Sequence, residues 1–97
     1  MKQVILHPEA EAEFSAAVAF YRDRSLELAV VFAGEVERAL TYVRENPKAT
    51  TLVRDEIRRR NVRRFPYAVL FREEADRIYV LAIAHDRRRP EYWLHRG

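Results

Sequence analysis

The hydrophobic period of this chain changes halfway along its length. Up to residue 43 apolar side chains recur at helical spacing, in two runs separated by the polar break 22–25. A break this short folds two helices into an antiparallel hairpin. After residue 50 the apolar residues instead follow the patterns of strands. The chain therefore needs one helical layer and one sheet layer packed together.

Local signals predict where the first elements begin and end. Residues 2–6 form a predicted short strand, and Pro8 suits the first position of the helix that follows. Ser25 is the predicted N-cap of the second helix. Asn46-Pro47 ends that helix, because a residue before proline is disfavoured in helical conformation.

The second half contains three predicted strands. Residues 68–72 and 78–84 are strands joined by the polar loop 73–76, and the nearly unbroken apolar run 78–84 indicates the most buried strand of the sheet. Residues 57–65 carry arginine on both alternation sets, so this strand is not expected at the centre, and a bulge is expected to reset its register.

The predicted order is β-αα-βββ. It corresponds to an α+β fold, in which an antiparallel sheet of about four strands carries the helical hairpin on one face and leaves the other uncovered. A chain of 97 residues forms one domain with a modest core, so residues 1–97 are assigned to a single domain.

Charge is distributed unevenly along the chain. The net charge is +3, but residues 51–97 carry twelve arginines, no lysine and seven acidic residues. Arginine is favoured where a carboxylate or phosphate is bound in a planar, bidentate manner. A GC-rich genome also enriches arginine, and charged strands can simply protect a sheet edge from aggregation. The functional interpretation is a surface that meets an acidic partner.

Other compositional features narrow the function classes. With no cysteine there is no disulfide framework or thiolate site, and three dispersed histidines give no metal-site spacing. Two glycines and no glycine-rich loop argue against ATP-dependent chemistry, and no cofactor is expected. The apolar run at the start is too short for a signal peptide or membrane span, so we expect a cytoplasmic protein that does not enter membranes.

Three clusters could carry chemistry: the arginines between residues 54 and 64, Arg72, and the tail 85–93. Because the ends of neighbouring antiparallel strands are adjacent, we expect them to converge on one surface. His85 could act there as a general acid or base in RNA transesterification, or could instead hydrogen-bond a backbone carbonyl at the strand end. Tyr92 could stack on a base, whereas Trp93 is interpreted as an aromatic plug at the sheet edge.

The opening "LHPEAEAEF" and the segment "VRRFPYAVLFREEADRIYVLAIAHDRRRPEYW" resemble the RelE/ParE superfamily of type II toxin–antitoxin toxins. The resemblance covers essentially the whole chain and implies the RelE/ParE-like fold. It also implies a cognate antitoxin whose C-terminal segment wraps the helices and covers the basic sheet, in a hetero-oligomeric complex.

The superfamily has two activities, and the resemblance implies different site residues for each. If the chain is a RelE-like ribosome-dependent mRNA endonuclease (an mRNA interferase), the catalytic candidates are His85, Tyr92 and Arg72. If it is a ParE-like, plasmid-stabilising toxin, it inhibits DNA gyrase without being an enzyme. In either case the target-binding candidates are the arginines Arg58, Arg60, Arg63, Arg64, Arg87, Arg88 and Arg89. The absence of lysine from the sheet strands favours the ParE-like branch, and an inactive binding or repressor module is the third alternative.

Overall fold

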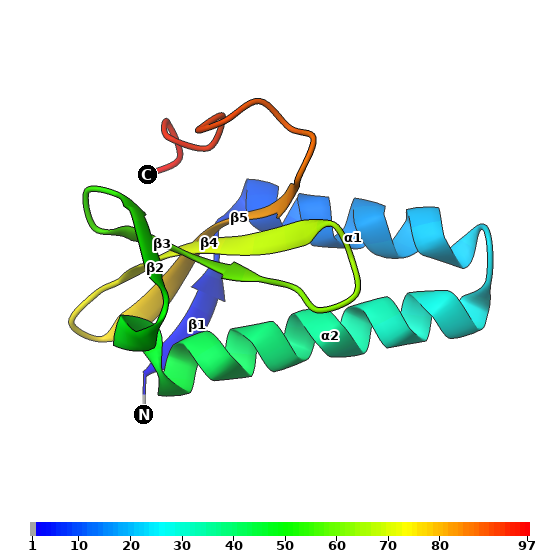
Figure 1. Ribbon diagram of the computed structural model, residues 1–97, viewed down its shortest axis with the longest axis horizontal. Coiled ribbons are helices and arrows are strands. Elements are labelled where there is room, and N and C mark those ends of the chain that lie inside the picture. The colour runs from blue at the N-terminus through cyan, green and yellow to red at the C-terminus, as the bar shows by residue number, and fades with distance from the viewer. Residues whose placement is uncertain (1) are drawn as a thin grey trace.

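The computed structural model of the protein describes residues 2–97 as two helices against one sheet (Figure 1). The elements, in chain order, are β1 (Gln3–Leu6), α1 (Pro8–Arg22), α2 (Leu26–Glu45), the 3₁₀ turn η1 (Pro47–Ala49), β2 (Thr51–Arg54), β3 (Ile57–Asn61), β4 (Tyr67–Glu73) and β5 (Arg77–His85). The α+β class and the helical hairpin are as predicted. Neither helix is long and apolar enough to cross a membrane.

The caps of both helices come from side chains next to the predicted starts. His7 Nδ1 accepts a hydrogen bond from the backbone N–H of Glu9 at 3.0 Å, and Ser25 Oγ accepts one from Leu28 at 3.2 Å. These bonds satisfy N–H groups that have no partner within the first turn of a helix. The predicted N-cap at Ser25 is therefore confirmed, and α2 ends immediately before Asn46 as expected.

The sheet has five strands in the order β1-β5-β4-β3-β2 and is mixed. The sheet differs from the expectation in two ways: it has five strands instead of about four, and it is not fully antiparallel, since β1 runs parallel to β5. The unpredicted strand is β2, whose four residues are all exposed and carry no buried alternation. Asp55, in left-handed conformation with φ 49°, turns the chain from β2 into β3. No tight turn joins β1 to β5, so nothing local imposes an antiparallel pairing.

Strand β5 lies between β1 and β4 and is the most buried strand, as its apolar run predicted. Leu81 has no partner on β4, which marks a bulge in β5. Val80 and Ile83 belong to the core between sheet and helices, whereas Leu81 and Ala82 belong to a second cluster. The extra residue therefore reverses the phase of the strand and supplies apolar side chains to both faces.

The face of the sheet opposite the helices is partly covered, which corrects the expectation that it is bare. The tail after β5 folds back over the sheet (Figure 1), and Trp93 is buried in the second cluster with Ile57, Leu70 and Leu81. Trp93 thus acts as an aromatic plug, as interpreted, but it covers the face of the sheet rather than its edge.

We predict that Trp93→Ala destabilises the protein by about 3 kcal/mol, because it removes the largest side chain of the second cluster and leaves a cavity. The free energy of unfolding, measured by urea denaturation, tests this. Leu94→Ala is the matched control, since the neighbouring Leu94 is 41% exposed and its loss should change stability by less than about 1 kcal/mol. Equal effects of the two variants would contradict the assigned role of Trp93.

Candidate functional site

One carboxylate, that of Glu13 on α1, connects the helix, the sheet and the tail. Its Oε1 accepts hydrogen bonds from the Ile83 N–H at 3.0 Å and from Arg96 Nη1 at 3.0 Å. Its Oε2 accepts from Arg96 Nη2 at 3.0 Å and from the Tyr92 hydroxyl at 2.6 Å. Arg96 also donates to the Leu81 carbonyl at 3.1 Å. The tail is therefore fixed to the sheet by a bidentate ion pair whose arginine is buried.

This network sets the protonation of Tyr92. Burial and the hydrogen bond to Glu13 both raise the pKa of the Tyr92 phenol well above its ordinary value. For Arg96, burial alone would lower the pKa of the guanidinium, but the hydrogen bonds and charge of Glu13 outweigh that effect and raise it. Tyr92 thus stays a phenol and Arg96 stays a cation at neutral pH.

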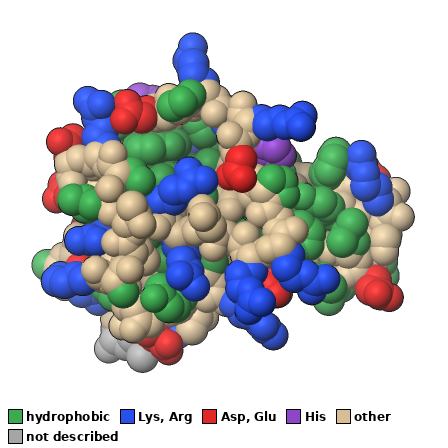
Figure 2. All heavy atoms as spheres, viewed as in Figure 1, with side chains coloured by type: hydrophobic (Ala, Val, Ile, Leu, Met, Phe, Trp, Pro, Cys, Tyr) green, Lys and Arg blue, Asp and Glu red, His purple; other side chains and the backbone are tan. Residues whose placement is uncertain are grey.

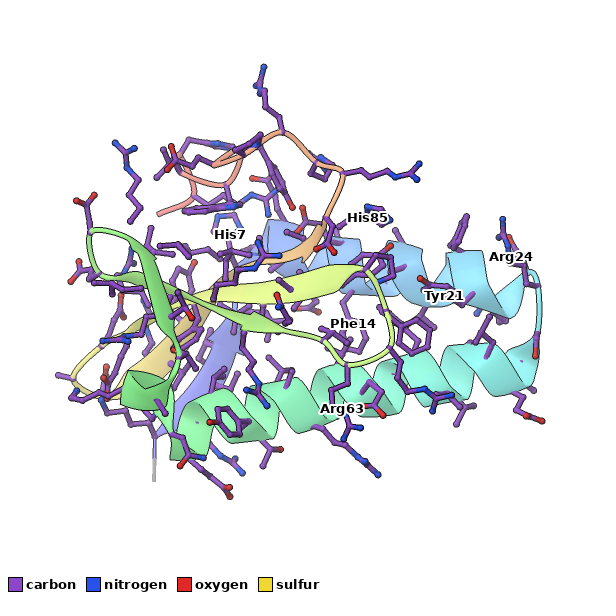
Figure 3. All side chains as sticks on the ribbon, viewed as in Figure 1. His7, Phe14, Tyr21, Arg24, Arg63 and His85 are labelled. Carbon is purple, nitrogen blue, oxygen red and sulfur yellow. The ribbon has the colours of Figure 1, made fainter. Side chains whose placement is uncertain are left out.

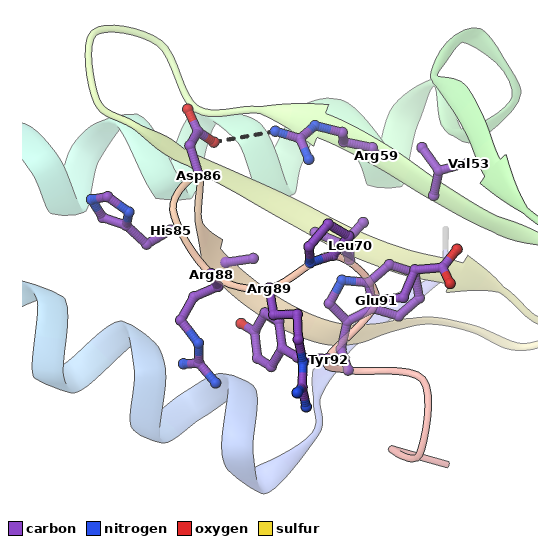
Figure 4. A pocket seen from close by; sticks show the side chains of 12 residues that line it. Val53, Arg59, Leu70, His85, Asp86, Arg88, Arg89, Glu91 and Tyr92 are labelled. Carbon is purple, nitrogen blue, oxygen red and sulfur yellow. Dashed lines mark hydrogen bonds and ion pairs between the residues drawn. The ribbon is translucent and has the colours of Figure 1, made fainter.

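A cavity of about 230 Å³ lies between the tail and the β2–β3 hairpin (Figure 4); we call it the tail pocket. Its polar lining comes chiefly from Arg59, His85, Asp86, Arg88, Arg89, Glu91 and Tyr92. Arg59 Nη2 pairs with Asp86 Oδ1 at 3.2 Å across its mouth. Arg88 lies over the ring of Tyr92, 3.8 Å from the centroid. The pocket therefore holds both cations and carboxylates, and at least one of its arginines is already neutralised.

His85 makes two local contacts at the end of β5. Its Nδ1 accepts the backbone N–H of Arg87 at 3.0 Å, and its ring meets Tyr67 edge-on with centroids 5.0 Å apart. With Nδ1 occupied as an acceptor, the neutral ring carries its proton on Nε2. The imidazole in this state has no free lone pair with which to take a proton from a substrate.

The structure brings His85 and Tyr92 together at the tail pocket but does not bring Arg72 to them. Tyr67 pairs with His85 at one end of β4, whereas Arg72 pairs with Tyr79 towards the other end. There Arg72 binds Glu74 at 2.9 Å and the Gly97 carbonyl at 3.2 Å. The three proposed catalytic side chains therefore do not form one constellation.

The predicted arginines are divided between two sides of the sheet. Arg58 donates to the Thr50 carbonyl at 2.7 Å, and Arg60 lies 3.7 Å above the ring centroid of Tyr42 on α2. Both are therefore on the helix side, whereas Arg59 between them lines the tail pocket. Sequence reasoning missed Arg59, although strand alternation in phase with Ile57 could have placed it.

The remaining arginines lie in turns. Arg63 and Arg64 are exposed between β3 and β4, where Arg64 has φ 71°. Arg87, Arg88 and Arg89 are exposed in the tail, and the last two line the tail pocket. Contrary to the expectation, the three clusters do not converge on a single surface.

Among residues 2–97, no group of three or more histidine, cysteine, aspartate or glutamate residues could hold a metal ion.

The family comparison agrees with this architecture. A family model described as the ParE toxin of the type II toxin–antitoxin system parDE matches residues 4–90. The chain belongs to the ParE toxin family. The superfamily resemblance found in the sequence is thereby confirmed, and the protein is a ParE-type toxin of a type II toxin–antitoxin system.

A solved structure of the chromosomal ParDE toxin–antitoxin system from P. aeruginosa resembles this ParE-type chain with a TM-score of 0.75. The two chains are 17% identical, and the match covers 88% of this chain and 96% of the other. At that identity the likeness establishes the fold. A comparison with curated proteins gave no match.

We predict that Glu13→Gln destabilises this ParE-type toxin by about 3 kcal/mol, because the buried Arg96 loses its counter-ion while the amide keeps the shape of the side chain. Urea unfolding measures the change. Glu37→Gln removes the same charge from an exposed position on α2 and should shift stability by less than about 0.5 kcal/mol. A loss below about 1 kcal/mol for Glu13→Gln would show that the ion pair does not secure the tail.

A second prediction concerns alkaline pH. Because folding raises the pKa of Tyr92, the stability gained from its protonated form is fully present below about pH 10 and is lost as the pH rises further. Tyr92→Phe should therefore lose less stability than the wild type between about pH 8 and pH 11. Unfolding free energies at both values measure this. Parallel losses in the two proteins would contradict the assigned environment of Tyr92.

Proposed function

We propose that this ParE-type toxin inhibits DNA gyrase by binding it, and that it is not a ribonuclease. The observation that carries the proposal is the occupied state of the two side chains best suited to acid–base chemistry. The Tyr92 hydroxyl donates to Glu13, and the acceptor nitrogen of His85 is used by the Arg87 N–H. A site that moves protons needs a group free to accept one.

The surface offered to the target is the tail. Arg87 and Arg89 are exposed, and no ion pair involves either of them within residues 2–97. The Glu13–Arg96 bond and the buried Trp93 hold the segment that carries them against the sheet. A charged loop on a rigid support suits recognition of an acidic protein surface, since little flexibility is lost on binding. Gyrase acts on chromosomal and plasmid DNA, so the proposal places the toxin in the cytoplasm.

A cognate antitoxin completes the proposed system. The free end of the helical hairpin exposes Phe20, Leu26 and Val30, which are 48%, 69% and 65% accessible. Figure 2 shows hydrophobic side chains gathered at this end of the molecule. Exposed apolar side chains grouped in this way mark protein–protein contacts. An antitoxin segment that covers them and continues to the basic tail would keep the toxin inactive in a hetero-oligomer.

The test is inhibition of supercoiling by purified gyrase. We expect the wild-type chain to inhibit it, and Arg87→Gln/Arg89→Gln to weaken inhibition by about tenfold, since two charges at the contact are lost. Arg22→Gln/Arg24→Gln is the control, because it removes the same charge from two exposed positions, the last residue of α1 and the turn that follows it. His85→Ala should leave inhibition within about threefold of wild type.

Two results would contradict the proposal. One is the absence of any effect on supercoiling at saturating protein. The other is translation-dependent mRNA cleavage that His85→Ala abolishes, which would assign the chain to the ribonuclease branch instead.

A further inference from the structure

A groove lies between α2 and the end of β3, and its lining includes residues from both faces of that strand. Two adjoining hollows of about 210 and 360 Å³ form it, and they share Arg60, Asn61 and Arg63. On one side α2 contributes Glu35, Arg38 and Tyr42, and on the other lies the segment 49–51. We call it the α2–β3 groove. It is distinct from the tail pocket, and Arg59 is the one residue that lines both.

The positive charge of this groove is not neutralised within the fold. In the described part of the chain, no ion pair involves Arg38, Arg60 or Arg63. The acidic residue of the lining is Glu35, which is buried and has one oxygen without a hydrogen-bond partner. Figure 2 shows Lys and Arg side chains gathered beside the middle of α2, and Figure 3 shows Arg63 reaching towards that helix from the β3–β4 turn.

The contrast with the tail pocket is direct. There, Arg59 pairs with Asp86 at 3.2 Å, and Arg54, on the neighbouring strand, pairs with Glu91 at 3.0 Å. Charges that are neutralised by neighbours attract an external anion weakly, whereas unpaired guanidinium groups on a concave surface attract it strongly. Among residues 2–97, three arginines that line the α2–β3 groove make no ion pair, whereas the tail pocket has one such arginine, Arg89. The groove is therefore the better anion site.

Neutral donors add to the guanidinium groups. Asn61 Oδ1 accepts a hydrogen bond from Arg59 Nε at 2.9 Å, which fixes the amide and leaves its NH₂ group available. Thr51, which carries a hydroxyl group, lines the same hollow. Arginine, asparagine and threonine together are the side chains that commonly bind phosphate oxygens along a nucleic-acid backbone.

The lining fits a nucleic acid better than an acidic peptide. A bound peptide is anchored by apolar side chains or by strand addition to a sheet edge. The apolar lining is limited to Ala39 and Ala49, and Arg60 covers one face of Tyr42. Strand addition also has little room, because β2 already pairs with β3 up to Arg59 and leaves two residues beyond it.

We propose that the α2–β3 groove binds the phosphodiester backbone of a nucleic acid. Arg38, Arg60 and Arg63 supply the charge, while Asn61 and Thr51 supply directed hydrogen bonds. This activity is additional to gyrase inhibition and uses a different surface, so the two can fail independently. It would give the toxin its own contact with the DNA on which its target works.

The test is fluorescence anisotropy with the purified full chain and labelled 20-nucleotide probes, one single-stranded and one duplex, without gyrase. Three phosphate contacts predict a salt slope of about −2 for the single strand or about −2.7 for the duplex. The probe that binds more tightly identifies the source of the phosphates.

Arg38→Gln/Arg63→Gln should weaken binding on the order of tenfold and reduce the salt slope by about 1 for each arginine. Both residues are exposed, so the fold should be unaffected. Arg87→Gln/Arg89→Gln is the charge-matched control and should retain binding within about threefold, because it changes net charge equally at a distant surface.

Three results would overturn the proposal. The first is no binding of either probe at low salt, and the second is equal weakening by the two double variants. The third is that a labelled hexaglutamate peptide binds as tightly as the nucleic acids, and that Arg38→Gln/Arg63→Gln weakens its binding to the same extent. That last result would assign the groove to an acidic protein partner.

Discussion

The buried ion pair between Glu13 and Arg96 supplies hydrogen-bond partners to backbone groups of β5 that the sheet leaves unpaired. Strand β1 pairs with β5 only as far as Val80, so the Leu81 carbonyl and the Ile83 N–H have no strand partner on that side. Arg96 donates to the first and Glu13 accepts from the second. Buried backbone groups must be paired, and here two side chains from opposite ends of the chain do it. These two side chains thereby connect the first helix and the C-terminal tail to strand β5.

The Glu13 carboxylate also determines how the side chain of Tyr92 is held in the tail. It holds Tyr92 as a hydrogen-bond donor and places Arg88 on the tyrosine ring. Each oxygen of Glu13 accepts two hydrogen bonds, so releasing the phenol to solvent would leave Oε2 of this mostly buried carboxylate with one donor fewer. Chemistry at Tyr92 would therefore compete with the stability of the fold. A binding surface makes no such demand, since it needs only that the tail stay in place.

The sequence predicted those elements that carry a strong hydrophobic period. Both helices and β5 bury a continuous apolar set, so their positions could be recognised from spacing alone. Strand β2 could not, because all four of its residues are exposed and its pairing with β3 depends on a left-handed turn at Asp55. The Glu13–Arg96 pair could not be predicted either, because its partners are 83 residues apart in the sequence and neither has neighbours that distinguish it from an ordinary surface charge.

The run Arg58-Arg59-Arg60 explains why one basic segment gives two different surfaces. Successive residues of a strand point to opposite faces, so the outer two reach the helix side while Arg59 reaches the tail. On the tail side Asp86 pairs with Arg59, whereas Arg60 makes no ion pair within residues 2–97 and its guanidinium rests on the Tyr42 ring instead. A cation over an aromatic face keeps its net charge, unlike one in an ion pair. Local neutralisation, rather than the number of arginines, therefore decides which face of this sheet attracts an anionic partner.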